Sequence, residues 1–171
     1  RILDLEPRSV LEIGCGTGLL LHRLVAYCQH YRGCDLSANV IAHLREQLER
    51  DPPADCVIEL TQTAAHDCAG LLDRAYDNIV INSVAQYFPS LVYLDTLLSQ
   101  LIDSSHPPRH IFIGDVRHHG LLEMFRSSVV QHRARDHENV ASLRRALAQA
   151  VAMETELLVA PAYFQALAQR S

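Results

Sequence analysis

Three glycines and two carboxylates near the start of the chain are spaced as in a site for a small charged ligand. Gly14, Gly16 and Gly18 stand between two apolar runs, a pattern that predicts a strand, a tight turn and a helix. Backbone N–H groups at such a turn can approach a ligand closely. Glu12 precedes the first glycine by two residues, and Asp35 follows the last by seventeen. The sequence therefore predicts a polar ligand between a glycine turn and two acidic strand ends.

The spacing of the glycines indicates which ligand this is. A dinucleotide fingerprint requires G-x-G-x-x-G, and here Leu19 takes the place of the third glycine. The carboxylate of Glu12 would repel a pyrophosphate and attract a cation. Asp35 would offer an acceptor to ribose hydroxyls. We therefore favour a sulfonium-bearing amino acid derivative as the ligand and argue against an NAD-dependent dehydrogenase.

These residues resemble the first two motifs of class I S-adenosylmethionine-dependent methyltransferases. The resemblance implies an α/β fold with a doubly wound, mostly parallel, Rossmann-like sheet and helices on both faces. It also implies S-adenosyl-L-methionine as the cofactor, with Gly14, Gly16 and Gly18 bordering its methionine part.

Composition bounds the class of protein. The chain has 171 residues, is 49% apolar and carries a net charge of −5, which fits one domain over residues 1–171 with a sizeable core. Arg144-Arg145 is the largest basic cluster, so we expect no nucleic-acid partner and no anionic membrane surface. No apolar run is long enough to cross a membrane, and no signal peptide opens the chain, so we expect a cytoplasmic protein.

Cysteine and histidine patterns argue against disulfides and metals. The five cysteines show no C-x-x-C spacing and mostly lie in apolar segments, as buried reduced thiols do. Ten histidines form no H-E-x-x-H motif, and the adjacent His118 and His119 cannot both point the same way on a regular element. We therefore expect neither a disulfide framework nor a bound metal.

Strand-like runs alternate with helical patterns along the first two thirds of the chain. The strands are expected at residues 10–14, 31–36, 56–62, 78–82 and 110–115, and the helices at 18–28, 38–50 and 90–102. Asp51-Pro52-Pro53 ends the second helix, because proline lacks a donor and restricts the residue before it. Such alternation predicts a parallel sheet with helices on both faces.

After Asp115 the pattern becomes mostly helical, over residues 121–134 and 138–156. Val140, Leu143, Leu147 and Val151 recur at helical spacing. We expect residues 118–156 to form a helical cap over the site, although covering a sheet face is an equal alternative. Only 157–160 is a later strand candidate, so the fold is expected to stop before its last two strands, and the chain to be a fragment of a larger polypeptide.

The run Asn-Ser-Val-Ala-Gln-Tyr-Phe-Pro-Ser follows the fourth predicted strand, at the edge of the sheet where ligands bind. Asn82, Ser83, Gln86 and Tyr87 bring four uncharged polar groups to this loop. Such groups can orient an amine or hydroxyl without trapping it as a cation.

This loop, the segment 113–117 and the segment 156–164 together resemble the methyltransferase domains embedded in nonribosomal peptide synthetases. That family methylates an aminoacyl or peptidyl group held as a thioester on a carrier domain, most often at nitrogen and sometimes at carbon. The resemblance implies neighbouring synthetase domains and a carrier-tethered substrate as partners.

The resemblance also assigns roles to individual residues. Those around the cofactor are Glu12, Gly14, Cys15, Gly16, Gly18 and Asp35, with Leu36 near the ribose and adenine, Ala65 and His66 beside the adenine, and Asn82 and Ser83 facing the amino acid part or the acceptor. Those on the acceptor side are Gln86, Tyr87, Asp115 and Arg117.

Methyl transfer to an amine needs mainly alignment, but the amine must lose a proton. The candidate bases are Tyr87, Asp115, His118 and His119, with histidine favoured by its pKa near working pH. Two alternatives stay open: a free-standing small-molecule methyltransferase, and a catalytically silent or epimerase-type domain on the same fold.

Overall fold

The computed structural model describes residues 1–53, 55–135 and 138–170. The chain divides into two compact units, Arg1–Asp115 and Val116–Ser171. Within the described ranges, no helix combines the length and the apolar character that crossing a membrane requires.

The first unit is built on a five-stranded parallel sheet, as predicted. Its strands are β1 (Ser9–Ile13), β2 (His30–Asp35), β3 (Val57–Gln62), β4 (Asn78–Asn82) and β5 (His110–Gly114), in the spatial order β3-β2-β1-β4-β5. The chain winds outward from β1 to β3 and then returns to the other side of β1. The order therefore reverses between β1 and β4, and the carboxyl ends of these two strands flank the crevice in which such sheets bind ligands.

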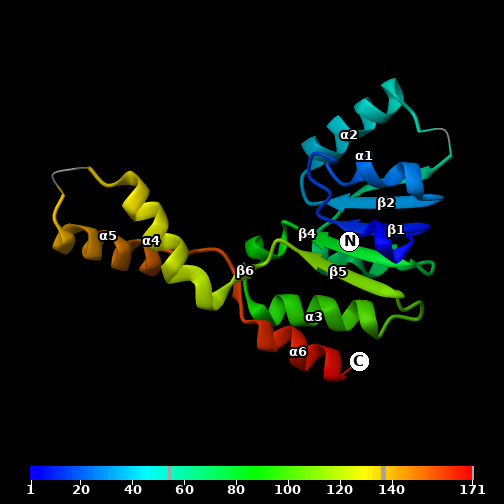
Figure 1. The fold of residues 1–171 in the computed structure, drawn as a ribbon. Helices are drawn as coiled ribbons and strands as arrows, with labels where there is room; N and C mark the ends of the chain where they lie inside the picture. The colour runs from blue at the N-terminus through cyan, green and yellow to red at the C-terminus, as the bar shows by residue number, and fades with distance from the viewer. Residues whose placement is uncertain (54, 136–137, 171) are drawn as a thin grey trace. The chain divides into compact units, whose positions relative to one another are not determined.

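Helices cover both faces of this sheet (Figure 1). α1 (Leu21–Leu24) and α2 (Ala38–Arg50) lie on one face, and α3 (Leu91–Ile102) lies on the other. The side chains of Ser37 and Ser90 cap α2 and α3 by accepting hydrogen bonds from backbone N–H groups three residues on. The bounds of α2 match the prediction, and α3 begins one residue later than predicted.

The helix predicted over residues 18–28 is shorter in the structure, so that prediction was wrong in its bounds. Helical structure begins at Leu21, three residues late, and α1 passes after Leu24 into a 3-10 turn, η2 (Val25–Tyr27). Gly18 has φ +80°, outside the helical region, so it belongs to the turn. One short helix was expected before the glycine turn, and η1 (Leu3–Leu5) lies there. Two other 3-10 segments of this unit, η3 (Ala65–Leu71) and η4 (Ala85–Tyr87), were not predicted.

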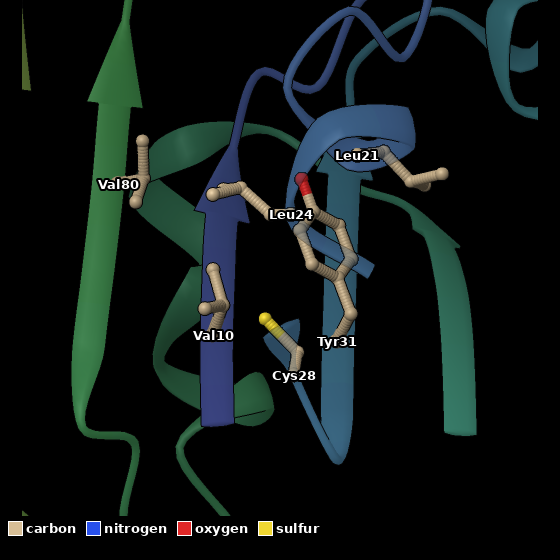
Figure 2. Packing of buried hydrophobic residues seen from close by; sticks show 6 residues of the cluster. All are labelled: Val10, Leu21, Leu24, Cys28, Tyr31 and Val80. Carbon is tan, nitrogen blue, oxygen red and sulfur yellow. The ribbon is translucent and has the colours of Figure 1, made fainter. Parts of the chain in front are cut away.

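Side chains from β1, β2, β4 and α1 form a core cluster beside the sheet. Val10, Leu21, Leu24, Tyr31 and Val80 are buried in it. Figure 2 shows the Tyr31 ring standing among these side chains, with its hydroxyl directed toward the carboxyl ends of β1 and β2. A buried tyrosine hydroxyl needs a hydrogen-bond partner, and its direction brings it to the ligand-binding edge of the sheet.

The second unit contains three longer helices and a short sheet. Its elements are β6 (Arg117–His118), η5 (His119–Leu121), α4 (Leu122–Arg133), α5 (Val140–Ala152), β7 (Leu158–Val159) and α6 (Pro161–Arg170). α4 and α5 lie within the predicted helical segments, and β7 lies within the strand candidate 157–160. β6, which pairs with β7 in parallel, was not predicted, because two residues are too few to show a periodic pattern. α6 was not predicted either.

Candidate functional site

A cavity of about 680 Å³ lies at the carboxyl ends of β1, β2 and β4, where the strand order reverses. Every residue on its wall belongs to the unit Arg1–Asp115. The sequence-predicted residues on the wall are Glu12, Gly14, Cys15, Gly16, Asp35, Leu36, Ala65, His66, Asn82, Ser83 and Tyr87. The structure therefore brings most of the predicted cofactor residues together around one space.

The glycine turn forms one side of the cavity. Gly14, Gly16 and Gly18 all have positive φ, at 79°, 51° and 80°. The N–H groups of Gly14 and Cys15 donate to the carbonyl of Cys34 at 2.7 and 2.9 Å, which ties the turn to the end of β2. A Cβ on Gly14 would collide with the Val84 side chain, so the turn passes too close to the segment after β4 to carry any side chain there.

Asp35 holds the glycine turn from the other strand. Its Oδ2 accepts a hydrogen bond from the N–H of Gly16 at 3.0 Å, and its Oδ1 accepts one from the N–H of Ser37 at 2.9 Å. Each carboxylate oxygen has room for a second hydrogen bond. Asp35 can therefore fix the turn and still offer acceptors to a ligand in the cavity.

Glu12 is a buried carboxyl group on the cavity wall, and its residue is only 3% exposed. Burial, with a further contribution from the negative charge of Asp35, raises the pKa of Glu12 to about 8. The hydroxyl of Tyr31 donates a hydrogen bond to its Oε2. A carboxyl group kept from water in this way favours a positively charged ligand, which would restore its ionised form.

Tyr31 is a site residue that sequence reasoning missed. In the sequence it reads as one of the apolar residues of a strand. In the sheet it lies directly opposite Val10, and Glu12 is two residues further along the same face of β1. Only the strand register, which the sequence does not reveal, brings the tyrosine hydroxyl within reach of the carboxyl group.

His66, Phe88 and Tyr93 form an aromatic group on another part of the wall. The Nδ1 of His66 lies 2.9 Å from the hydroxyl of Tyr93, and the backbone N–H of His66 donates to the same hydroxyl at 3.1 Å. The rings of Phe88 and Tyr93 are 4.8 Å apart between centroids. Together with the exposed Leu36, they offer the kind of apolar surface on which a base can stack. Tyr93, in the first turn of α3, was not predicted.

Asn82 and Ser83 lie where β4 ends. Ser83 has φ +58°, an uncommon conformation for a residue other than glycine, and its N–H donates to the carbonyl of Gly114 at 3.2 Å. The Nδ2 of Asn82 donates to the Ser83 hydroxyl at 3.0 Å. Asp115, at the end of β5, also has a positive φ of 55°. Backbone strain of this kind concentrates at functional sites.

The two polar residues of η4 have different places. Tyr87 is 73% exposed and lies on the cavity wall. Gln86 is buried outside the wall, and its Nε2 donates to the carbonyl of Ser83 at 3.0 Å. Tyr87 is therefore available to a substrate, whereas Gln86 supports the loop from within.

Two further predicted residues of the first unit do not line the cavity. Gly18 faces Leu44 of α2, and Asp115 is exposed at the end of the first unit. Arg117, His118 and His119 belong to the second unit. There, the Nε of Arg117 lies 2.6 Å from the Oε2 of Glu156 in an ion pair, and its guanidinium stacks over Phe125.

Thiol and metal chemistry find no support in this cavity. Cys15 lies on the wall, but burial, with a further contribution from Glu12, raises the pKa of its thiol well above the usual range. The thiol is therefore protonated at neutral pH and is a poor nucleophile. Four of the five cysteines are buried, as predicted. Over the described ranges, no three His, Cys, Asp or Glu side chains gather as metal ligands would.

Comparisons with known proteins agree with this geometry. The family model described as a methyltransferase domain matches residues 11–106. The chain is 40% identical over 158 residues to the probable non-canonical nonribosomal peptide synthetase CymA of Salinispora arenicola, and 38% identical over 170 residues to chondramide synthase cmdD of Chondromyces crocatus. These matches cover 92% and 99% of the chain but only 2% and 4% of the relatives, so the chain spans a small part of each.

A solved structure shows the same fold. The N-methyltransferase NodS from Bradyrhizobium japonicum WM9, in complex with S-adenosyl-L-homocysteine, superposes with a TM-score of 0.56 at 17% identity, covering 86% of this chain and 70% of NodS. The parallel sheet with helices on both faces is the Rossmann-like fold of class I methyltransferases. Because the family model covers more than half of the chain, this protein belongs to the family of methyltransferase domains.

Proposed function

We propose that the cavity at the ends of β1, β2 and β4 holds S-adenosylmethionine, the cofactor of this methyltransferase family, and that the chain transfers its methyl group to an aminoacyl or peptidyl amine carried as a thioester. The observation that carries the proposal is the buried carboxyl group of Glu12 beside the glycine turn. A neutral or anionic dinucleotide would gain nothing from that group. A sulfonium or ammonium ion would favour the ionised form of the Glu12 carboxyl group and pair with it.

The residues present fit the cofactor. The turn at Gly14 and Gly16 offers backbone close to the cavity, and Gly16 has open space where a side chain would stand. Asp35 keeps acceptor capacity for ribose hydroxyls. Leu36 and His66 supply the wall beside an adenine. When bound, the cofactor supplies an electrophilic methyl group on a positively charged sulfur.

The relatives support the choice of acceptor. CymA and chondramide synthase cmdD are large synthetases of which this chain matches a short stretch at 38–40% identity. In our proposal the chain is a methyltransferase domain of such a synthetase, its partners are a carrier-tethered substrate and neighbouring synthetase domains, and it acts in the cytoplasm, where free thiols stay reduced.

The residues of this chain then have three tasks in the transfer. Asn82, Ser83 and Tyr87 orient the amine in line with the methyl group, and alignment can lower such barriers by up to about 7 to 11 kcal/mol. A base takes the proton of the amine, and Tyr87, Asp115, His118 and His119 stay our candidates. A role for either histidine requires residues 118–156 to act as a cap over the cavity in the working protein, and we propose that they do.

The test uses S-adenosylmethionine with a labelled methyl group and aminoacyl thioesters of a small thiol as mimics of the carrier-bound acceptor. Label is expected in the product when the amine is free and not when it already carries two methyl groups. The variants Tyr87→Phe, Asp115→Asn, His118→Ala and His119→Ala separate the candidate bases. Loss of the base lowers kcat and removes the corresponding limb of the pH–rate profile, whereas loss of an orienting group lowers kcat at every pH. A folded chain that binds the cofactor and labels none of these thioesters would contradict the proposed acceptor.

A further inference from the structure

The hydroxyl of Tyr31 donates a hydrogen bond to the carboxyl group of Glu12, which lies on the cavity wall. Tyr31 lies opposite Val10 in the β1–β2 pair, and Glu12 lies two residues further along β1. Two residues of a parallel strand span about 6.6 Å, a reach that a tyrosine ring with its hydroxyl covers. Of the hydrogen bonds in the described ranges, the one from Tyr31 to Oε2 is the only side-chain bond to Glu12.

The groups around Glu12 are acidic or neutral. They are Asp35 and Cys34 at the end of β2, Cys15 in the glycine turn, and Tyr31 itself. Over the part of the chain that the structure describes, Glu12 forms no ion pair with Arg or His. Burial and the charge of Asp35 therefore hold its pKa at about 8, and at pH 7 the side chain is mostly protonated.

A cation in the cavity changes this balance, because a positive charge nearby favours the carboxylate over the acid. A hydrogen bond from a hydroxyl to a carboxylate is also stronger than one to a neutral carboxyl group. Tyr31 therefore stabilises the form of Glu12 that a cationic ligand requires. Its ring is fixed in the core by Leu21 and Leu24, so the hydroxyl needs no rearrangement to do so (Figure 2).

We propose that Glu12 gives up a proton to solvent when the positively charged cofactor binds, and that Tyr31 is the positioning residue that holds the resulting carboxylate in place. The O–H bond of the carboxyl group breaks, the proton passes to the buffer, and nothing is oxidised or reduced. This inference rests on the proposed function, because it takes the cationic cofactor to bind in this cavity.

The test is calorimetric titration of S-adenosylmethionine into the full chain at pH 7, in phosphate and in Tris. The two buffers differ in ionisation enthalpy, so the difference in observed heat counts the protons released. We expect close to one proton per bound cofactor in the wild type. Glu12→Gln should not release that proton. The number of protons released by this variant is subtracted from the wild-type number, which corrects for any proton exchanged by the cofactor itself. Adenosine, which carries neither positive charge, should release none.

The role of Tyr31 is tested by Tyr31→Phe, which keeps the ring and removes the hydroxyl. We expect cofactor affinity at pH 7 to fall about tenfold, which corresponds to about 1.4 kcal/mol. The midpoint of the pH dependence of binding should move to higher pH. In a Glu12→Gln background the same substitution should have no further effect on affinity.

Tyr76→Phe is the matched control. Tyr76 is also a buried tyrosine, but its hydroxyl donates to the carbonyl of Leu71 at 3.1 Å, away from the cavity wall. Tyr76→Phe should lower the free energy of unfolding without changing proton release or cofactor affinity.

The outcomes separate the two proposals. Binding without proton release, release that persists in Glu12→Gln, or wild-type affinity in Tyr31→Phe would overturn the inference and leave the proposed cofactor intact. Absence of binding by a folded wild type would refute the proposed function itself. Should Tyr31→Phe fail to fold, proton counting on the wild type and Glu12→Gln still decides whether Glu12 exchanges the proton.

Discussion

Replacing Gly14 by alanine tests the geometry of the glycine turn in two ways at once. Gly14 has φ +79°, and a Cβ at this position would collide with the Val84 side chain. Gly16 has φ +51° but open space around the same position. Both glycines therefore need a positive φ, but only Gly14 also lies against a neighbouring side chain.

The expected magnitudes follow from these differences. An L-residue in the left-handed region costs about 1–2 kcal/mol, which is the whole expected loss for Gly16→Ala. Gly14→Ala adds overpacking against Val84, which costs about 1–3 kcal/mol, so its total is about 2–5 kcal/mol. Gly70, in η3, has neither a positive φ nor a neighbour within 4 Å, and Gly70→Ala should leave stability unchanged or raise it by up to about 1 kcal/mol.

The assay is urea denaturation followed by circular dichroism, with the free energy of unfolding compared among the three variants and the wild type. Val84→Ala in the Gly14→Ala background should recover the overpacking part, as a coupling of about 1–3 kcal/mol in a double-mutant cycle. Equal losses for Gly14→Ala and Gly16→Ala, or no recovery with Val84→Ala, would show that the turn does not pass close to Val84.

Three further substitutions test the elements around the cavity. Leu44→Ala, which empties the fully buried contact between α2 and Gly18, should lower the free energy of unfolding by about 2–5 kcal/mol in urea titrations, and a loss below 1 kcal/mol would contradict that packing. Ser90→Ala removes the acceptor for the N–H of Tyr93 at 3.2 Å and should cost about 1 kcal/mol in the same assay; no loss would mean that the cap is not formed. Because the pKa of Glu12 is raised from 4.5 to about 8, the folded state holds its proton more tightly than the unfolded state. The protonated carboxyl group therefore stabilises the folded state fully below pH 4.5. This contribution is lost as pH rises toward 8, by up to about 1.4 kcal/mol per pH unit. Glu12→Gln should flatten that slope between pH 5 and 7.5, and an unchanged slope would assign it to other groups.

The fold of the first unit could be predicted well where two kinds of local signal agree. α2 runs over Ala38–Arg50 as predicted, because Ser37 caps its start and Asp51-Pro52-Pro53 ends it. β4 also has the predicted bounds. The helix after the glycine turn was predicted too long, because the positive φ of Gly18 cannot be read from an apolar pattern that continues through Leu21.

The site was predictable for residues whose role follows from their place at a strand end. Glu12 and Asp35 lie on the cavity wall for that reason. Tyr31 and Tyr93 were missed because each reaches its partner through strand register or through a contact between distant segments. Gln86 reads as a polar loop residue in the sequence, yet η4 turns it inward, where it donates to the carbonyl of Ser83. Which of the candidate bases acts stays a prediction.

The cavity at the ends of β1, β2 and β4 should take a sulfonium cofactor and not a dinucleotide. Calorimetric titration of S-adenosylmethionine into the chain, with NAD as the control ligand and circular dichroism to show that the chain is folded, tests it most directly. We predict binding of S-adenosylmethionine with micromolar affinity and no heat of binding with NAD. Binding of NAD, or binding of neither ligand by a folded chain, would contradict this assignment of the cavity.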